Sequence, residues 1–193
     1  PAEFHAQTAV EAAIKLHPQV IDRLDQIESI ELTTHESAMR IINKTGPLYN
    51  FADRDHCLQY MVAIGLLHGQ LTANDYSDEA ASDPRIDQLR NKMTVIENPQ
   101  YSKDYLNPEK RSIANAVQIH FIDGNKTEKI AIEYPLGHRN RRQEGIPILQ
   151  QKYNNNIRKL FPNGLRISFD QHLDAMPVVE FMQQLQKFVL TQE

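Results

Sequence analysis

The chain has 193 residues, of which 40% are hydrophobic and 24% charged, and its formal net charge is −4. This composition is typical of a globular domain, and the acidic balance argues against nucleic acid as the main partner. No apolar run is long enough to span a bilayer, and the single Cys57 cannot form an internal disulfide. We therefore expect a cytoplasmic protein that binds neither membranes nor nucleic acid.

The first part of the sequence predicts two helices and a strand. Small apolar residues recur at helical spacing over residues 6–17, and Pro18 is expected to end that helix. Residues 27–34 alternate between apolar and polar side chains, which predicts a half-buried strand. A helix is expected to follow over residues 36–44.

A segment that is apolar nearly all round then predicts a buried helix, with Asp53 as its N-cap and Gly69 as its C-terminal stop. His56 and Tyr60 are four residues apart, so this helix would place both on one face near its positive end. Such a pair would suit an anion site. The simpler interpretation is structural: a buried tyrosine whose hydroxyl finds a backbone partner, and a histidine that completes a cap.

After this helix, Asp83 and Pro84 mark the start of another helix that continues to residue 93. Residues 94–97 predict a short strand. Residues 98–108 contain two prolines and two tyrosines, and we expect them to form a loop.

The strongest strand signal is a β-hairpin, because residues 114–122 and 129–134 both alternate and flank an Asp123-Gly124 turn. With the two earlier strands, the hairpin gives a sheet of about four strands. Helices would cover one face of it, so the predicted fold is a small two-layer α+β domain. The expected covering helices are residues 6–17, 54–68 and 84–93.

Two further helices, over residues 147–161 and 175–190, carry more apolar positions than the small sheet needs. We expect them to dock on a part of the protein that precedes this sequence. We therefore divide the chain into the small α+β domain, residues 1–144, and the C-terminal helices, residues 145–193.

Arg139, Arg141 and Arg142 beside His138 form the most concentrated positive charge in the sequence. A solvated basic turn and a clamp for carboxylate or phosphate are both compatible with this pattern. The sequence has no nucleotide-binding glycine motif, no common zinc-ligand spacing and no nucleophile elbow. We therefore expect no cofactor and no metal site.

Four long stretches resemble the C-terminal part of the MmgE/PrpD family, in its dehydratase branch. They are PAEFHAQTAVEAA, GPLYNFADRDHCLQYMVAIGLLHG, NPEKRSIANAV and EYPLGHRNRRQEGIPILQQK, and they cover most of the chain. The resemblance implies a two-domain enzyme, in which an all-helical domain precedes this α+β domain and the last helices return to it. It also implies a cofactor-independent hydro-lyase that removes water from 2-methylcitrate to give 2-methyl-cis-aconitate in propionate breakdown.

The resemblance further implies site residues at the cleft between the two domains. His5, from the FH of the first stretch, and Tyr60, from the QY of the second, would be the catalytic residues. Tyr60 could donate or relay a proton, and His5 could do the same or hold a substrate carboxylate. Arg54, His56 and His138 are weaker candidates for contact with substrate carboxylates.

The implied partners are a small tricarboxylate substrate, the absent helical domain and further copies in a homo-oligomer. Because the family's other acid–base groups lie before Pro1, we expect this fragment alone to be inactive. The alternative is a non-catalytic binding or dimerisation module that forms one wall of a tricarboxylate site.

Overall fold

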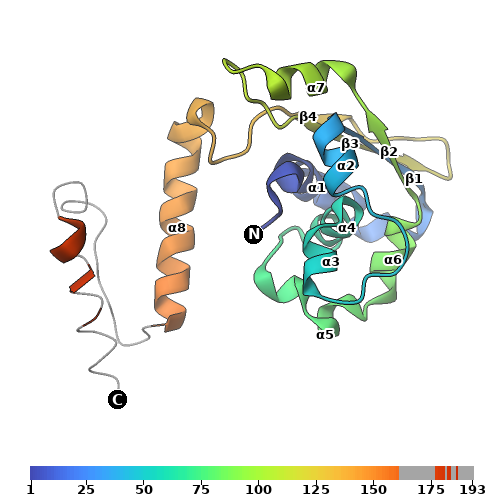
Figure 1. Cartoon of the computed structure of the whole chain (residues 1–193). Coiled ribbons are helices and arrows are strands. Elements are labelled where there is room, and N and C mark those ends of the chain that lie inside the picture. The colour runs from blue at the N-terminus through green and yellow to red at the C-terminus, as the bar shows by residue number, and fades with distance from the viewer. Residues whose placement is uncertain (161–176, 181, 184–185, 187–193) are drawn as a thin grey trace. The chain divides into compact units, whose positions relative to one another are not determined.

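The computed structural model describes residues 1–160, 177–180, 182–183 and 186 (Figure 1). The chain divides into two compact units, Pro1–Pro135 and Leu136–Glu193. Our division after residue 144 stays a prediction. Most of the helix expected over residues 175–190 lies outside the described residues.

The first unit is built on a mixed sheet of four strands in the order β2-β1-β3-β4. The central strand β1 (Ile27–Thr34) runs parallel to β2 (Met93–Glu97) and antiparallel to β3 (Asn115–Phe121). Strand β3 pairs in turn with β4 (Ile130–Ile132), which completes the predicted hairpin. The predicted α+β class and the four-stranded sheet are therefore confirmed.

The two faces of this sheet differ in polarity. On one face Ile30 and Leu32 of β1 lie opposite Ile119 and Val117 of β3, and all four are buried in the core. On the other face Glu31 of β1 accepts a hydrogen bond from Lys129 at 2.7 Å, near the exposed surface. The alternation of the strand sequence therefore decides which face the helices cover.

Three helices form the core behind the apolar face. Helix α1 (Gln7–Val20) packs against β3 and β4, α4 (Leu58–His68) packs against α1, and α6 (Pro84–Arg90) packs against α4. The remaining helical segments of this unit are η1 (Phe4–Ala6), η2 (Ile21–Gln26), α2 (Glu36–Ile41), α3 (Phe51–Asp55), η3 (Ala73–Tyr76), α5 (Asp78–Ala81) and α7 (Pro99–Leu106).

The second unit contains η4 (Arg139–Arg141) and α8 (Arg142–Leu160). The helix predicted over residues 147–161 is present, but it begins earlier, at Arg142, and includes Pro147. No helix in the described part of the chain is both long and apolar enough to cross a bilayer.

Pro18 does not end the first helix, so that expectation was wrong. Helix α1 continues to Val20, and the amide of Ile21 still donates to the carbonyl of His17. A proline removes only one backbone donor here, close to the end of the helix. The complete burial of Val20 favours keeping the last turn helical.

The prediction of a single central helix was also wrong, because the helix is interrupted between α3 and α4. Cys57 is extended, with φ −125° and ψ 108°, and the next amide, Leu58 N, donates to Ile42 O at 2.8 Å. Asn50, rather than Asp53, caps the first of the two helices. A hydrogen bond to a distant segment thus interrupts a sequence that is locally helical, and His56 and Tyr60 do not share a helix.

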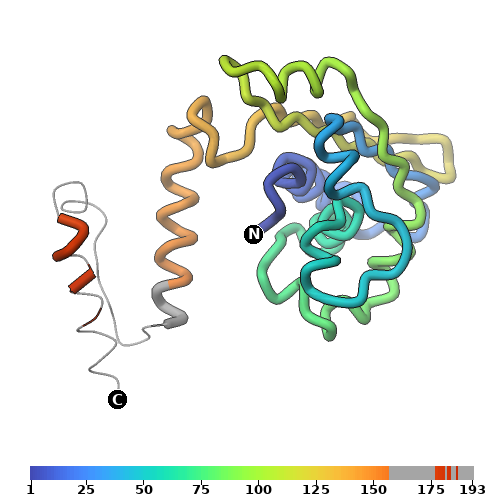
Figure 2. Tube along the Cα trace, viewed as in Figure 1, coloured from blue at the N-terminus to red at the C-terminus, as the bar shows by residue number. Residues whose placement is uncertain are grey.

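The stretch expected to be a loop, residues 98–108, contains α7. The side chain of Asn98 caps this helix by accepting from the amides of Gln100 and Tyr101, and Pro99 occupies its first position. Helix α7 lies against α2 (Figure 2). The helix starts and stops predicted at Asp83, Pro84 and Gly69 are confirmed, and Gly69 has the left-handed φ of 63° that favours glycine.

Helices α1 and α4 pack so closely at Gly65 that a side chain there would overlap with α1. Every residue of α4 from Leu58 to Leu67 is buried, which explains why its sequence is apolar all round. At Gly65 an added Cβ would lie 2.9 Å from the Cβ of Ala13 and 3.4 Å from the carbonyl oxygen of Val10. The small residues of both helices are therefore a packing requirement.

We predict that Gly65→Ala destabilises the protein by about 1–2 kcal/mol, because overpacking outweighs the gain in helix propensity. Chemical denaturation would measure the loss in the free energy of unfolding. Adding Ala13→Gly should restore part of it by removing the opposing methyl group. A stabilised Gly65→Ala variant would contradict the close contact.

Candidate functional site

The N-terminal segment places His5 in a buried polar setting beside Glu3. The Oε2 atom of Glu3 accepts from the backbone amide of His5 at 2.8 Å, and its Oε1 atom lies 2.7 Å from the ring Nδ1 of His5. The His5 residue is only 8% exposed. Burial raises the pKa of Glu3, but the hydrogen bonds from His5 and the nearby charges of His5 and His56 outweigh it and lower that pKa overall.

The second ring nitrogen of His5 meets helix α7. Its Nε2 atom lies 3.2 Å from the hydroxyl of Tyr105, a half-buried residue. An ionised carboxylate can only accept, so we assign the imidazole proton to Nδ1, beside Glu3. The lone pair on Nε2 then accepts from the Tyr105 hydroxyl.

A second histidine, His35, contacts the rings of both His5 and Tyr105. The ring of His35 stacks on Tyr105 at 4.7 Å and 11°, and its centroid is 5.4 Å from that of His5. Burial, with a smaller contribution from the charge of His5, lowers the pKa of His35 to about 4. Its Nδ1 atom caps α2 by accepting from Ala38 N at 3.4 Å, and Nε2 has no hydrogen-bond partner among the described residues.

The backbone of His5 is fixed by a buried amide from the sheet. Asn115, the first residue of β3, donates from Nδ2 to the carbonyl of His5 at 2.8 Å and to the hydroxyl of Thr8 at 2.7 Å. The Thr8 hydroxyl in turn donates to the carbonyl of Ile113 at 2.5 Å. These bonds join the start of α1 to the edge of the sheet.

Tyr60 has the backbone partner that the structural interpretation predicted. Its hydroxyl donates to the carbonyl of Asp75 at 2.6 Å, and its ring stacks on Tyr76 with a centroid distance of 6.1 Å. Burial raises the pKa of Tyr60 to about 12, although the charge of Arg54 partly opposes this. The hydroxyl therefore stays protonated at neutral pH, which suits a donor and not a base.

Arg54 and His56 lie at the end of α3 and differ in exposure. The guanidinium of Arg54 is buried, and its two terminal nitrogens donate to the carbonyl of Tyr76 at 2.7 Å and to a carboxylate oxygen of Asp78 at 2.7 Å. His56 forms the C-cap of α3, and its side chain is about half exposed. Of these two residues, His56 is thus the more accessible to a ligand.

His138 belongs to the second unit, where it caps η4. Its Nδ1 atom accepts from the amide of Asn140 at 3.2 Å. In the neighbouring basic turn, Arg141 is paired with Glu144 through bonds of 2.6 and 2.9 Å. Part of the positive charge that the sequence concentrates here is therefore neutralised.

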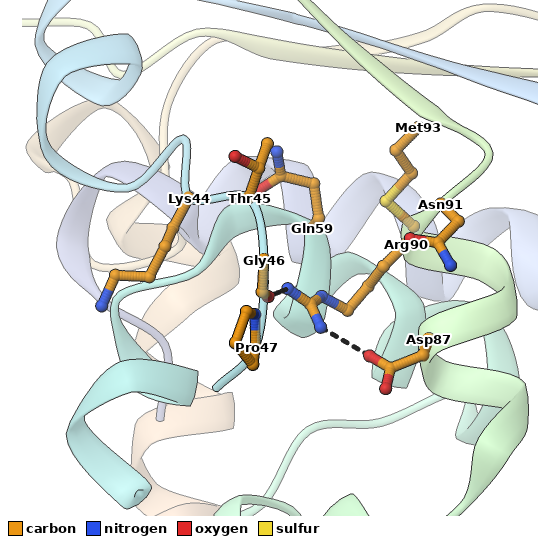
Figure 3. Close-up of a pocket in the computed structure, with 9 residues that line it drawn as sticks. All are labelled: Lys44, Thr45, Gly46, Pro47, Gln59, Asp87, Arg90, Asn91 and Met93. Atoms are coloured by element: carbon orange, nitrogen blue, oxygen red, sulfur yellow. Dashed lines mark hydrogen bonds and ion pairs between the residues drawn. The ribbon is translucent and has the colours of Figure 1, made fainter. Parts of the chain in front are cut away.

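A polar cavity of about 340 Å³ lies elsewhere in the first unit, between the loop before α3 and the end of α6 (Figure 3). Arg90 spans it, donating to the carbonyl of Gly46 at 2.9 Å and pairing with Asp87 at 2.5 Å. None of the predicted site residues lines this cavity. The lining residues are Lys44, Thr45, Gly46, Pro47, Gln59, Asp87, Arg90, Asn91 and Met93. In the part of the chain that the structure describes, no group of three or more His, Cys, Asp or Glu side chains is arranged to hold a metal ion.

Comparison with protein families identifies the chain. The model of the MmgE/PrpD C-terminal domain matches residues 1–174. The chain belongs to the MmgE/PrpD family. The match confirms the resemblance seen in the sequence, and it includes both His5 and Tyr60.

Several curated MmgE/PrpD proteins are similar to this chain. The mitochondrial 2-methylcitrate dehydratase of Yarrowia lipolytica is 55% identical over 85% of this chain and 32% of its own length. The 2-methylcitrate dehydratases of Cupriavidus necator and Escherichia coli K12 are 51% and 50% identical, each over 94% of this chain and 40% of its own length. The chain thus spans about two fifths or less of these relatives.

Three residues of the His5 cluster were missing from the sequence-based prediction. Glu3, His35 and Tyr105 contact His5 or one another, yet His35 and Tyr105 lie 30 and 100 residues away from His5 in the sequence. One signal was available for His35: it follows a predicted strand and precedes a predicted helix, the position of an N-cap. Glu3 lies only two positions from His5, whereas the contact of Tyr105 with His5 in this MmgE/PrpD chain depends on the tertiary fold.

We predict that His35 makes stability depend on pH. Its folded pKa of about 4 lies below the ordinary 6.5, so the unfolded state binds the extra proton between these values. The free energy of unfolding should therefore fall as pH drops from 6.5 to 4. His35→Asn retains a side chain that can cap α2 but cannot titrate, so denaturation curves of this variant should lose that part of the slope.

The matched control is His120→Asn, which makes the same replacement at a half-buried position of β3, and it should retain the slope of the original protein. An unchanged slope in His35→Asn would show that another group causes the pH dependence.

Proposed function

We propose that this chain is the C-terminal part of a hydro-lyase that converts 2-methylcitrate to 2-methyl-cis-aconitate in propionate catabolism. The observation that carries the proposal is 50–55% identity, over 85–94% of the chain, to proteins named 2-methylcitrate dehydratase. The reaction removes a proton and a hydroxyl group from adjacent carbons. The electron pair of the C–H bond becomes the new C=C bond, and the hydroxyl leaves as water after receiving a proton.

His5 and Tyr60 would supply the two proton transfers. His5 suits the general base, because Glu3 accepts from Nδ1 and the lone pair lies on Nε2. To take the substrate proton, Nε2 would have to release the Tyr105 hydroxyl. Tyr60 suits the general acid, because its hydroxyl has a pKa of about 12 and therefore carries a proton at neutral pH. To protonate the leaving group, this hydroxyl would have to exchange its bond to Asp75 O for one to the substrate.

Three further residues would contact the carboxylates of the tricarboxylate substrate. We assign this role to His56, which is half exposed, and to Arg54 and His138, the other two candidates from the sequence. Since Arg54 already donates to Tyr76 and Asp78, it would act through its charge or by exchanging its exposed partner Asp78. The reaction as proposed needs no cofactor.

The proposal extends to the rest of the protein. A helical domain preceding Pro1 would supply the remaining acid–base groups and pack against the C-terminal helices, and the enzyme would be a cytoplasmic homo-oligomer. In this view residues 1–144 form the small domain and residues 145–193 return to the helical one.

Turnover by the complete protein tests this function. Purified protein is mixed with 2-methylcitrate, and the conjugated double bond of the product is followed by ultraviolet absorbance, with citrate as the comparison substrate. Saturable formation of 2-methyl-cis-aconitate by the complete protein, and none by residues 1–193 alone, is the expected result. Binding of 2-methylcitrate without turnover would instead support a non-catalytic module.

We predict that His5→Ala in the complete enzyme lowers kcat/KM by roughly 10²-fold or more, because the base is lost. His17→Ala is the matched control, since His17 also has a ring nitrogen bonded within the fold, to Leu66 O at 2.8 Å, but lies near the other end of α1. Both variants should lose some thermal stability, and only His5→Ala should lose turnover. Equal turnover in the two variants would make His5 structural.

We further predict that Tyr60→Phe lowers kcat by about 10²- to 10⁴-fold while the ring keeps its packing. Tyr76→Phe is the control, because that hydroxyl also donates to a backbone carbonyl, Pro1 O, at 2.8 Å. The two variants should show similar shifts in Tm. Near-normal turnover in Tyr60→Phe would remove Tyr60 from the catalytic residues.

A further inference from the structure

The two ring nitrogens of His5 have partners of different chemical character, and this difference points to a role for Glu3. We propose that Glu3 is a positioning residue, which fixes His5 as the Nδ1–H tautomer and so keeps the lone pair on Nε2, the atom that would accept the reacting proton in place of the Tyr105 hydroxyl. The catalytic consequence rests on the proposed function. The tautomer itself is independent of it.

The geometry of Glu3 holds both the ring and the backbone of His5. One carboxylate oxygen lies 2.7 Å from Nδ1, and the other accepts from the amide of the same residue at 2.8 Å. Only Phe4 separates Glu3 from His5 in the sequence, and the two hydrogen bonds together leave the ring little freedom to rotate away. Both side chains are about nine-tenths buried, at 10% and 12% exposure, which strengthens the bond relative to water.

Tyr105 cannot select the tautomer by itself. Its hydroxyl lies 3.2 Å from Nε2 and can either donate to that atom or accept from it. The Tyr105 ring is held by stacking on His35, so the hydroxyl stays near Nε2 whichever nitrogen carries the proton. The carboxylate, which only accepts, is therefore the group that decides between the two tautomers.

The other titratable groups around His5 do not replace this carboxylate. His35 remains neutral near pH 7, and His56 is close enough to affect Glu3 through its charge. On α2, which packs against η1, Glu36 is paired with Arg40 at 2.5 Å. Among the described residues of the first unit, Glu3 is the carboxylate bonded to the His5 ring, and it is the counter-charge that His5 would use after accepting a proton.

The tautomer is measured by NMR of the complete protein labelled with ¹⁵N in its histidines, since protonated and unprotonated ring nitrogens differ in chemical shift. The His5 signals are assigned by their loss in His5→Asn. We expect Nδ1–H in the original protein and in Tyr105→Phe, and a shift toward Nε2–H in Glu3→Ala. An Nε2–H tautomer in the original protein, or no change in Glu3→Ala, would overturn the proposal.

Kinetics test the consequence with a milder variant. Glu3→Gln keeps an oxygen for the backbone amide of His5 but loses the charge, so kcat/KM should fall on the order of 10²-fold with little change in KM. The acid limb of the kcat/KM profile should move to lower pH, because the protonated imidazole loses its counter-charge. Glu28→Gln, which changes the same charge at an exposed position of β1, should leave activity and profile unchanged.

These outcomes separate the two proposals. A Glu3→Gln enzyme that is less stable but has the original kcat and pH profile would make Glu3 only a cap of η1. If the original protein fails to dehydrate 2-methylcitrate, the proposed function fails, and the NMR measurement still decides whether Glu3 sets the tautomer.

Discussion

The buried amide of Asn115 is the interaction on which the position of His5 depends. It ties the first turn of α1 to the first residue of β3, and Thr8 extends the link to the carbonyl of Ile113. Hydrogen bonds in such a buried setting are costly to break, because each group would lose its partner away from water. The backbone of His5 is thereby fixed to the sheet, so that only its ring remains to be oriented. Glu3 and Tyr105 orient the ring, because each lies within hydrogen-bonding distance of one of its nitrogens.

The topology of the sheet explains why residues so far apart in sequence meet here. Strands β1 and β2 are parallel, with Thr34 opposite Glu97, so both end at the same edge. His35 directly follows β1, and α7, which carries Tyr105, directly follows β2. Strand β3 is antiparallel to β1, so its first residue, Asn115, lies at this edge as well. Chain segments that leave the sheet at one edge can thus assemble a site that no local motif contains.

The accuracy of the sequence-based predictions followed how local the decisive interaction was. The hairpin and the helix start at Asp83 depend on residues within a few positions, and both were predicted correctly. The start of α7 at Asn98 and Pro99 has the same local chemistry, but the neighbouring prolines and tyrosines favoured a loop. The break at Cys57 depends on a bond from Leu58 to Ile42, which no periodicity reveals. His5 and Tyr60 were predicted as site residues from the family resemblance and stay predictions, and the contacts of His5 with His35 and Tyr105 required the fold.

Two pairs of identical side chains show how position alone assigns different chemistry. His5 and His35 are 5.4 Å apart, yet one has a carboxylate on its ring and the other is buried against an aromatic face without such a partner. The carboxylate fixes the ring of His5, while burial lowers the pKa of His35, whose ring supports Tyr105. Tyr60 and Tyr76 are likewise stacked, and burial raises the pKa of both hydroxyls. The two tyrosines thus share one electrostatic effect and differ in what their hydroxyls bind, because Tyr60 donates to Asp75 O and Tyr76 to Pro1 O.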